Sequence, residues 1–86
     1  MSDNVEQTIC KIMNTELFVE TPADRIDLDE SLRDGYGLDS LGFVELRVQC
    51  EDLFAVQIGD DDFTPENFST VRSVANLVRK LQGVPA

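Results

Sequence analysis

One serine of this 86-residue chain is well placed to do chemistry. Ser40 follows Asp39 in the run Gly37-Leu38-Asp39-Ser40-Leu41, where a segment containing glycines meets a predicted helix. The first turn of a helix presents unpaired backbone N–H groups and the positive end of the helix dipole, and both favour an anion such as a phosphodiester. The sequence therefore predicts that Asp39 caps the helix and that the Ser40 hydroxyl is a site of covalent modification.

The remaining composition excludes most other chemistry. The chain has no histidine, which removes Ser-His-Asp and Cys-His catalysis together with every zinc site that needs histidine. Ser40 consequently has no activating base and is a poor candidate nucleophile. Cys10 and Cys50 show no CxxC spacing, so we expect two reduced thiols and no metal site. The run Asp60 to Asp62 lacks the spacing of an EF-hand loop and is expected to be a solvated turn.

The charge balance narrows the class of partner. Seventeen Asp and Glu residues stand against seven Lys and Arg, for a formal net charge of -10. Nucleic acid binding needs a basic surface, and anionic membranes are disfavoured for the same reason. No apolar run approaches the roughly 20 residues of a membrane span, and no signal-peptide pattern opens the chain. We therefore expect one domain over residues 1–86, freestanding, monomeric and cytoplasmic.

Apolar spacing predicts an all-α fold: a small four-helix bundle with three main helices, a short third helix and a long first loop. A first helix is expected over about 3–18, where apolar residues fall at helical intervals. Residues 20–39 lose this periodicity and collect turn formers, which predicts the long loop. The apolar residues that anchor this loop are expected to be Ile26, Leu28 and Leu32.

The second helix is expected over about 40–54 and carries two apolar stripes. The inward stripe comprises Phe43, Leu46, Cys50, Leu53 and Phe54. The adjacent stripe of Leu41, Val44 and Val48 is either additional core or a face left open for a partner. A short helix over about 65–68 is expected because Thr64 suits an N-cap and Pro65 the first helical position. A last helix follows over about 70–82 and is stopped by Gly83.

These features resemble the acyl carrier protein family, in which the serine of a DSL motif receives a 4'-phosphopantetheine arm. The resemblance implies that a phosphopantetheinyl transferase moves the arm from coenzyme A onto Ser40, with Asp39 and Leu41 beside it. The protein is then a non-catalytic carrier whose arm holds acyl groups as thioesters. The matching residues are Gly37-Leu38-Asp39-Ser40-Leu41, Val44-Glu45-Leu46, Glu51-Asp52-Leu53-Phe54, Val56, Ile58 and Thr70-Val71.

The charge map is consistent with brief docking onto basic patches. Residues 39–66 hold eight acidic residues against the single Arg47, whereas residues 67–86 hold three basic residues and no acidic one. Electrostatic attraction of this kind raises association rates while leaving dissociation fast. The expected partners are the transferase and acyl-loading, condensing and acyl-processing enzymes. The expected docking residues are Leu41, Val44, Glu45, Val48, Glu51 and Asp52.

Departures from the family pattern leave the cargo and the partners open. Gly42 stands where many members have an acidic residue, Arg47 interrupts the acidic face, and Ala55 replaces a common helix-ending glycine. Fatty acyl, extender, polyketide and aminoacyl groups all remain possible, although Phe43, Arg47, Asn67 and Phe68 favour a specialised pathway such as polyketide biosynthesis.

Two alternatives remain open. A peptidyl carrier matches less well because Asp39, rather than a Gly-Gly-x-Ser pattern, precedes Ser40, whereas an aminoacyl carrier remains possible. The alternative from another class is an unmodified acidic helical module that uses Ser40 only as a cap. Tyr36, Phe63 and Phe68 are expected to seal the core under the loops or to border a cleft for the cargo.

Overall fold

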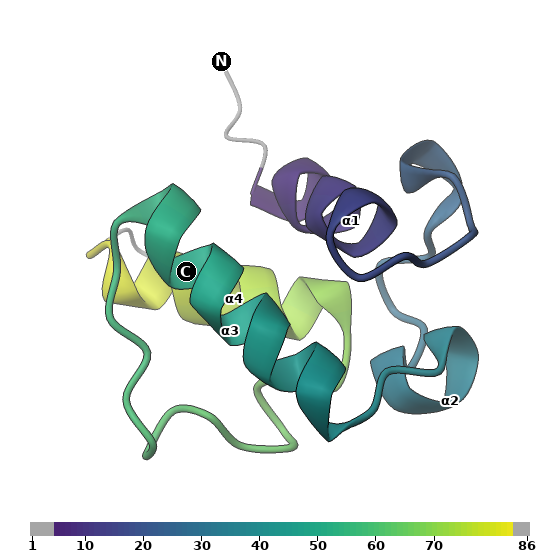
Figure 1. The fold of residues 1–86 in the computed structure, drawn as a ribbon. Coiled ribbons are helices and arrows are strands. Elements are labelled where there is room, and N and C mark those ends of the chain that lie inside the picture. The colour runs from purple at the N-terminus through teal and green to yellow at the C-terminus, as the bar shows by residue number, and fades with distance from the viewer. Residues whose placement is uncertain (1–4, 84–86) are drawn as a thin grey trace.

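A computed structural model describes residues 5–83, and within that range every regular element is helical (Figure 1). The prediction of an all-α fold with a long first connection is therefore confirmed. Helix α1 packs against α3 and α4, and the connection after α1 folds back onto α1. The elements are α1 (Val5–Thr15), the 3-10 turn η1 (Ala23–Arg25), α2 (Leu32–Tyr36), α3 (Ser40–Phe54) and α4 (Val71–Leu81).

One core joins the helices and the connecting segments. Ile9 and Met13 of α1 are fully buried, as their spacing predicts. Burial of side chains of this size is worth about 1.5–3 kcal/mol each. The connecting segments also contribute, because Ile26, Leu32 and Leu38 are buried and Leu28 packs against the core. The buried residues contributed by α3 and α4 are Leu46, Cys50, Val71, Val74, Ala75, Leu77 and Val78.

Helix α1 is shorter than the expected range of about 3–18. The expected start lies outside the described residues, and the helix ends at Thr15. Asn14 stops it by donating from its side-chain amide to the carbonyls of Val19 and Thr21, both at 2.9 Å. Phe18 then takes a left-handed conformation with a φ of 58°, and its side chain remains 84% exposed.

The expectation of a loop throughout residues 20–39 is wrong at α2. Ser31 caps this helix by accepting from the Asp34 N–H at 3.0 Å. Gly37 ends it in a left-handed conformation, with its N–H donating to the Arg33 carbonyl at 3.1 Å. The sequence marks both ends with ordinary cap residues. A helix of five residues is too short to show apolar periodicity, so from the sequence its caps cannot be told from turn formers.

The expected helix over about 65–68 is a single turn. Thr64 does cap it, since its hydroxyl accepts from the Asn67 N–H at 3.1 Å. The turn closes where the Phe68 N–H donates to the Thr64 carbonyl at 3.0 Å, and no further turn follows. One turn fixes several backbone angles for one hydrogen bond and does not propagate. The short helix of the fold therefore precedes the serine rather than following it.

The ranges expected for the last two helices agree with the structure to within one residue. Thr70 and Gln82 are the caps of α4 rather than parts of it. On α3, Phe43 and Phe54 are partly buried, but the inward assignment of Leu53 is wrong because its side chain is 55% exposed. Leu53 lies in the last turn of α3, and apolar spacing does not report how far the neighbouring helices extend to cover it.

We predict that Ala55→Gly raises the free energy of unfolding by about 0.5–1 kcal/mol. Ala55 ends α3 with a φ of 54°, a conformation that costs an L-residue roughly 1–2 kcal/mol and a glycine almost nothing. The greater freedom of glycine in the unfolded chain offsets part of this gain. Urea unfolding measures the change. Ala23→Gly, in the right-handed turn η1, is the matched control and should lower stability; equal losses in both variants would contradict the prediction.

Candidate functional site

Ser40 is the first residue of α3, and its side chain is exposed. Asp39 caps the helix, as predicted, because its carboxylate accepts from the Gly42 N–H at 2.9 Å. The Asp39 carbonyl then accepts the Phe43 N–H at 2.9 Å, which begins the helical ladder. Since Asp39 occupies the cap, the Ser40 hydroxyl is not needed to start the helix, and within residues 5–83 no hydrogen bond holds it. This geometry argues against the alternative in which Ser40 acts only as a cap.

A buried leucine holds the segment before the serine in place. Leu38 is 6% exposed and donates its N–H to the Leu32 carbonyl at 3.0 Å, which ties the start of α3 to α2. Gly42 lies directly against it, since a Cβ at this position would stand 2.8 Å from the Leu38 Cδ2. The absence of a side chain at Gly42 thus leaves room for Leu38 to pack against the first turn of α3.

A cleft of about 450 Å³ opens beside Ser40. It is walled by α2, the first turns of α3 and the segment before α4. Phe68 is buried in the core, and Phe63 and Tyr36 pack against it, as expected for rings that seal the core. Phe63 and Phe68 also line the cleft, whereas the Tyr36 hydroxyl accepts the Asp27 N–H at 2.7 Å. The lining residues are Ser31, Arg33, Asp34, Ser40, Phe43, Val44, Phe63, Thr64, Pro65, Phe68 and Ser69.

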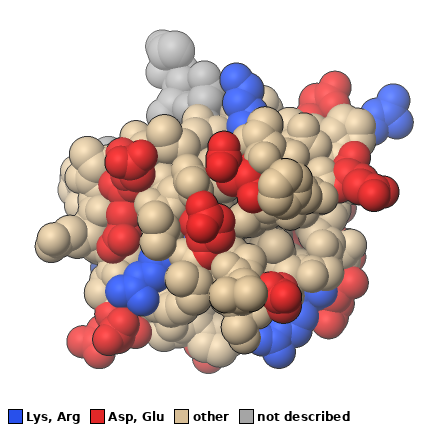
Figure 2. Space-filling view, viewed as in Figure 1, with Lys and Arg blue, Asp and Glu red and all other residues tan. Residues whose placement is uncertain are grey.

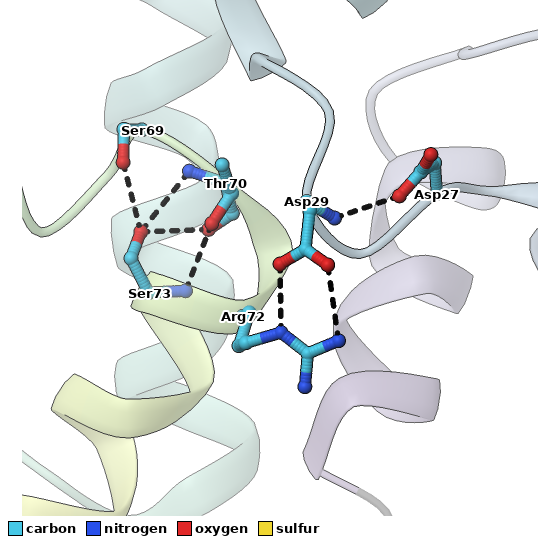
Figure 3. Close-up of polar contacts among 6 residues, drawn as sticks. All are labelled: Asp27, Asp29, Ser69, Thr70, Arg72 and Ser73. Carbon is cyan, nitrogen blue, oxygen red and sulfur yellow. Dashed lines mark hydrogen bonds and ion pairs between the residues drawn. The ribbon is translucent and has the colours of Figure 1, made fainter.

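Two arginines fix the walls of this cleft. Arg47 lies over the Phe63 ring at 5.0 Å and pairs with Asp60 at 3.2 Å, so it holds the segment after α3. Arg72 of α4 binds both carboxylate oxygens of Asp29, at 2.7 and 3.2 Å (Figure 3). This contact lowers the pKa of the Asp29 carboxyl, because the Arg72 guanidinium hydrogen-bonds the charged form.

Backbone hydrogen bonds also join the segment before α2 to the start of α4, and they hold it more firmly than the exposed Arg72–Asp29 ion pair does. The Leu32 N–H donates to the Ser69 carbonyl at 2.9 Å, and the Arg72 N–H donates to the Leu28 carbonyl at 3.0 Å. At the start of α4, Thr70 and Ser73 exchange side-chain and backbone hydrogen bonds at 3.0 Å (Figure 3). The segment leading into α2 is therefore attached to the capped end of α4, and this attachment positions the α2 wall of the cleft.

The expected docking residues lie in different environments. The apolar side chains of Leu41, Val44 and Val48 are 79%, 47% and 49% exposed, which places them on the open face of α3 rather than in the core. Asp52 is also exposed, and Glu45 is half-buried beside Gln49. In Figure 2, carboxylates are interspersed among uncharged side chains across the face that carries α3.

Glu51 differs from Glu45 because its carboxylate accepts a backbone N–H rather than a side-chain amide of the same helix. It is half-buried and accepts the Ile58 N–H at 2.8 Å, and its carbonyl accepts the N–H groups that close the end of α3. These contacts give Glu51 a structural role within the chain.

The two cysteines are buried, as expected for inert thiols. Burial raises the pKa of the Cys50 thiol to about 12 and also raises that of Cys10. Because only the thiolate is reactive, neither residue offers a nucleophile at neutral pH. Residues 5–83 contain no group of His, Cys, Asp and Glu that could hold a metal ion. Among the helices in that range, none is long and apolar enough to cross a membrane.

The α2 wall of the cleft is not predicted from the sequence. Ser31, Arg33 and Asp34 reach the cleft only because α2 forms and turns back at Gly37. The available signal is Ser31 six positions before Gly37, with the charged Arg33 and Asp34 between them. This pattern is as typical of a loop as of a single capped helical turn, so spacing alone does not place these residues at a cleft.

An exposed serine at the capped start of a rigid helix, beside a cleft of modest size, defines a small helical carrier domain. Comparison with known proteins supports this class: residues 7–78 match the family model described as "Phosphopantetheine attachment site". The chain belongs to this phosphopantetheine-binding carrier protein family, whose cofactor is covalently bound 4'-phosphopantetheine. The exposed, unencumbered Ser40 hydroxyl and the adjoining cleft fit that group.

The curated relatives are carrier proteins of similar length. The D-alanyl carrier protein of Streptococcus uberis is 41% identical over 66 residues, which cover 77% of this chain and 81% of the relative. The D-alanyl carrier protein of Streptococcus pyogenes serotype M5 is 33% identical over 79 residues, covering 92% of this chain and 96% of the relative. The similarity therefore extends through the helices that build the site.

Proposed function

We propose that Ser40 bears the phosphopantetheine arm and that the protein carries an aminoacyl group on it as a thioester. The observation that carries the proposal is the division of roles at the start of α3. Asp39 supplies the cap, so the Ser40 oxygen is exposed and free to be esterified without loss of a structural hydrogen bond. The backbone N–H groups of the first turn and the helix dipole favour the phosphodiester that results.

The chain contributes position rather than reactivity to this function. The chain has no histidine, and within residues 5–83 no carboxylate is hydrogen-bonded to the Ser40 hydroxyl, so nothing in that range activates it as a nucleophile. The transferase must therefore supply the base that removes its proton. When bound, the arm supplies the thiol that forms the thioester. Ser40 anchors the arm on a rigid helix, so that the cargo stays at high effective concentration near a docked partner.

The proposed cargo is an amino acid, and D-alanine is the first candidate. The two relatives with the stated identities are both named D-alanyl carrier proteins, which favours the aminoacyl alternative over fatty acyl or polyketide cargo. The cleft is consistent with a small polar cargo, since the hydroxyls of Ser31, Thr64 and Ser69 and the carboxylate of Asp34 share it with aromatic rings. A longer acyl chain is the second candidate, because Phe43, Phe63 and Phe68 offer apolar contact.

The proposed docking surface is the open face of α3 next to Ser40. Leu41, Val44 and Val48 supply apolar contact, and Glu45 and Asp52 supply the charge that attracts a basic patch. We expect the transferase and the enzyme that loads the amino acid to use this surface. Such a contact should weaken as ionic strength rises, because exposed charges are screened over about 8 Å at physiological salt.

Ser40→Ala should abolish modification without unfolding the protein. Wild-type apo protein, incubated with coenzyme A and a broad-specificity phosphopantetheinyl transferase, should gain the mass of one phosphopantetheine. It should also gain one thiol that reacts rapidly in the folded state, since Cys10 and Cys50 are buried. Intact mass and thiol titration measure both changes.

The matched control for this experiment is Ser69→Ala, which removes a hydroxyl that lines the same cleft. This variant should be modified like the wild type. If the folded, initially unmodified wild type gains no mass, or if Ser40→Ala gains it, the attachment site is not Ser40 and the acidic interaction module becomes the better account.

The cargo can be identified on protein purified from its own cells. We expect neutral hydroxylamine to release a D-alanyl derivative from the holo protein, because thioesters react with this nucleophile whereas the phosphodiester does not. Chiral amino-acid analysis of the released material checks the prediction, with Ser40→Ala as the blank. Release of a fatty or polyketide hydroxamate in place of an amino acid would contradict the aminoacyl proposal and leave the attachment site intact.

Leu41→Ala should raise the KM of the transferase about tenfold with little change in kcat, corresponding to about 1.4 kcal/mol of docking energy. Leu41 is 79% exposed, so stability should change by less than about 0.5 kcal/mol. Leu53→Ala is the matched control, because Leu53 is an exposed leucine at the opposite end of α3. Equal effects of the two substitutions would contradict a docking surface centred on Leu41.

A further inference from the structure

The cleft beside Ser40 contains a single cationic side chain, Arg33 of α2. Its guanidinium carbon lies 6.0 Å from the centre of the Phe43 ring. Phe43 follows Ser40 by three residues on α3, so the two share one face of the helix, with Cβ atoms about 5–6 Å apart. Arg33, Phe43 and Ser40 all line the cleft, so the Phe43 ring holds the Arg33 guanidinium on the same cleft as the Ser40 hydroxyl.

Arg33 differs from the three arginines whose guanidinium groups pair with carboxylates of the fold. Arg47 pairs with Asp60, Arg72 with Asp29 and Arg79 with Glu6. Within residues 5–83, no carboxylate forms an ion pair with Arg33, and the Phe43 ring is its aromatic contact. Stacking of a guanidinium on an aromatic ring orients the planar group and leaves its N–H donors available.

Esterification of Ser40 creates an electrostatic problem that Arg33 is placed to relieve. A phosphodiester at Ser40 adds a negative charge next to the Asp39 carboxylate, in a cleft that also contains Asp34 and in a chain of formal net charge -10. The Asp39 carboxylate is partly compensated by the Gly42 N–H. A guanidinium offers two parallel N–H donors that match two phosphate oxygens, and such charge-assisted bonds are among the strongest in proteins.

We propose that Arg33 is a positioning residue that binds the phosphodiester of the arm. The guanidinium, held over Phe43, donates its N–H groups to the phosphate oxygens at the mouth of the cleft and directs the base of the arm over the cleft rather than into solvent. No covalent step is involved, and the contact exists only after modification. The inference rests on the proposed attachment at Ser40 and adds a role for α2, a helix that the serine motif does not include.

NMR of the holo protein with a free thiol tests the contact without any cargo. Conversion from apo to holo protein should shift the Arg33 Nε–H resonance by several linewidths and leave that of Arg25 unchanged, because exposed Arg25 lies in η1 outside the cleft. The phosphorus-31 resonance of the arm should differ between wild type and Arg33→Gln. The phosphorus-31 resonance of Arg33→Lys should differ less from that of the wild type, because lysine keeps the positive charge but lacks the two parallel N–H donors of a guanidinium.

Salt provides a second readout that a purely structural role would not reproduce. At about 1 M salt, where screening acts over about 3 Å, the phosphorus-31 difference between wild type and Arg33→Gln should shrink. Arg25→Gln is the matched charge control and should leave the phosphorus-31 resonance unchanged. Urea unfolding of each variant confirms that the fold is retained.

The outcomes separate this inference from the proposed function. If the transferase does not modify Ser40, the proposed function fails and the inference fails with it. If Ser40 is modified but the Arg33 Nε–H resonance stays in place and Arg33→Gln leaves the phosphorus-31 resonance unchanged, the attachment site stands and the inference is overturned. A shift that Arg25→Gln reproduces would also overturn it, since it would report net charge rather than contact.

Discussion

The presentation of Ser40 depends on the capped start of α3 and on the buried leucine just before it. Leu38 anchors the backbone in the core, and Asp39 closes the first turn of the helix through the Gly42 N–H. Each hydrogen bond of this kind is worth only about 0.5–2 kcal/mol. Together, the buried Leu38 and the Asp39 cap fix the direction of Ser40, and within residues 5–83 its hydroxyl has no structural hydrogen-bond partner. A serine that is to accept a large group must be held in place by its neighbours rather than by its own hydroxyl.

The charged residues also divide into those that hold the fold and those that face solvent. Within residues 5–83, three of the seven basic residues pair with carboxylates, where they join α1 to α4, the first connection to α4, and α3 to the segment after it. The remaining acidic side chains leave the surface strongly negative. Because exposed ion pairs contribute little stability, hydrophobic burial holds the fold together and the arginines mainly select how the segments around the cleft are arranged.

The sequence was sufficient to predict the helices with long apolar periods and the role of Asp39. Helix α3 agrees with the prediction because fifteen residues with two apolar stripes leave little ambiguity. Helix α2 is not predicted, because five residues carry no period. The turn at 65–68 lies where the sequence places it and is capped by Thr64 as predicted, but it is an isolated turn rather than a regular helix. Ser40 is a local feature and could be identified, whereas the cleft brings together segments far apart in the chain.

Two of the residues that depart from the family pattern have intramolecular explanations. Gly42 allows close packing against Leu38, and Arg47 holds Phe63 at the wall of the cleft. These two departures therefore carry less information about partners than the family pattern implies, whereas nothing in the structure explains alanine rather than glycine at the left-handed position 55. Selectivity is better sought in side chains that no ion pair or core packing engages, and the exposed apolar face of α3 and the guanidinium of Arg33 meet that condition. Apolar spacing indicates the first of these, whereas the second reaches the cleft only because α2 folds beside α3.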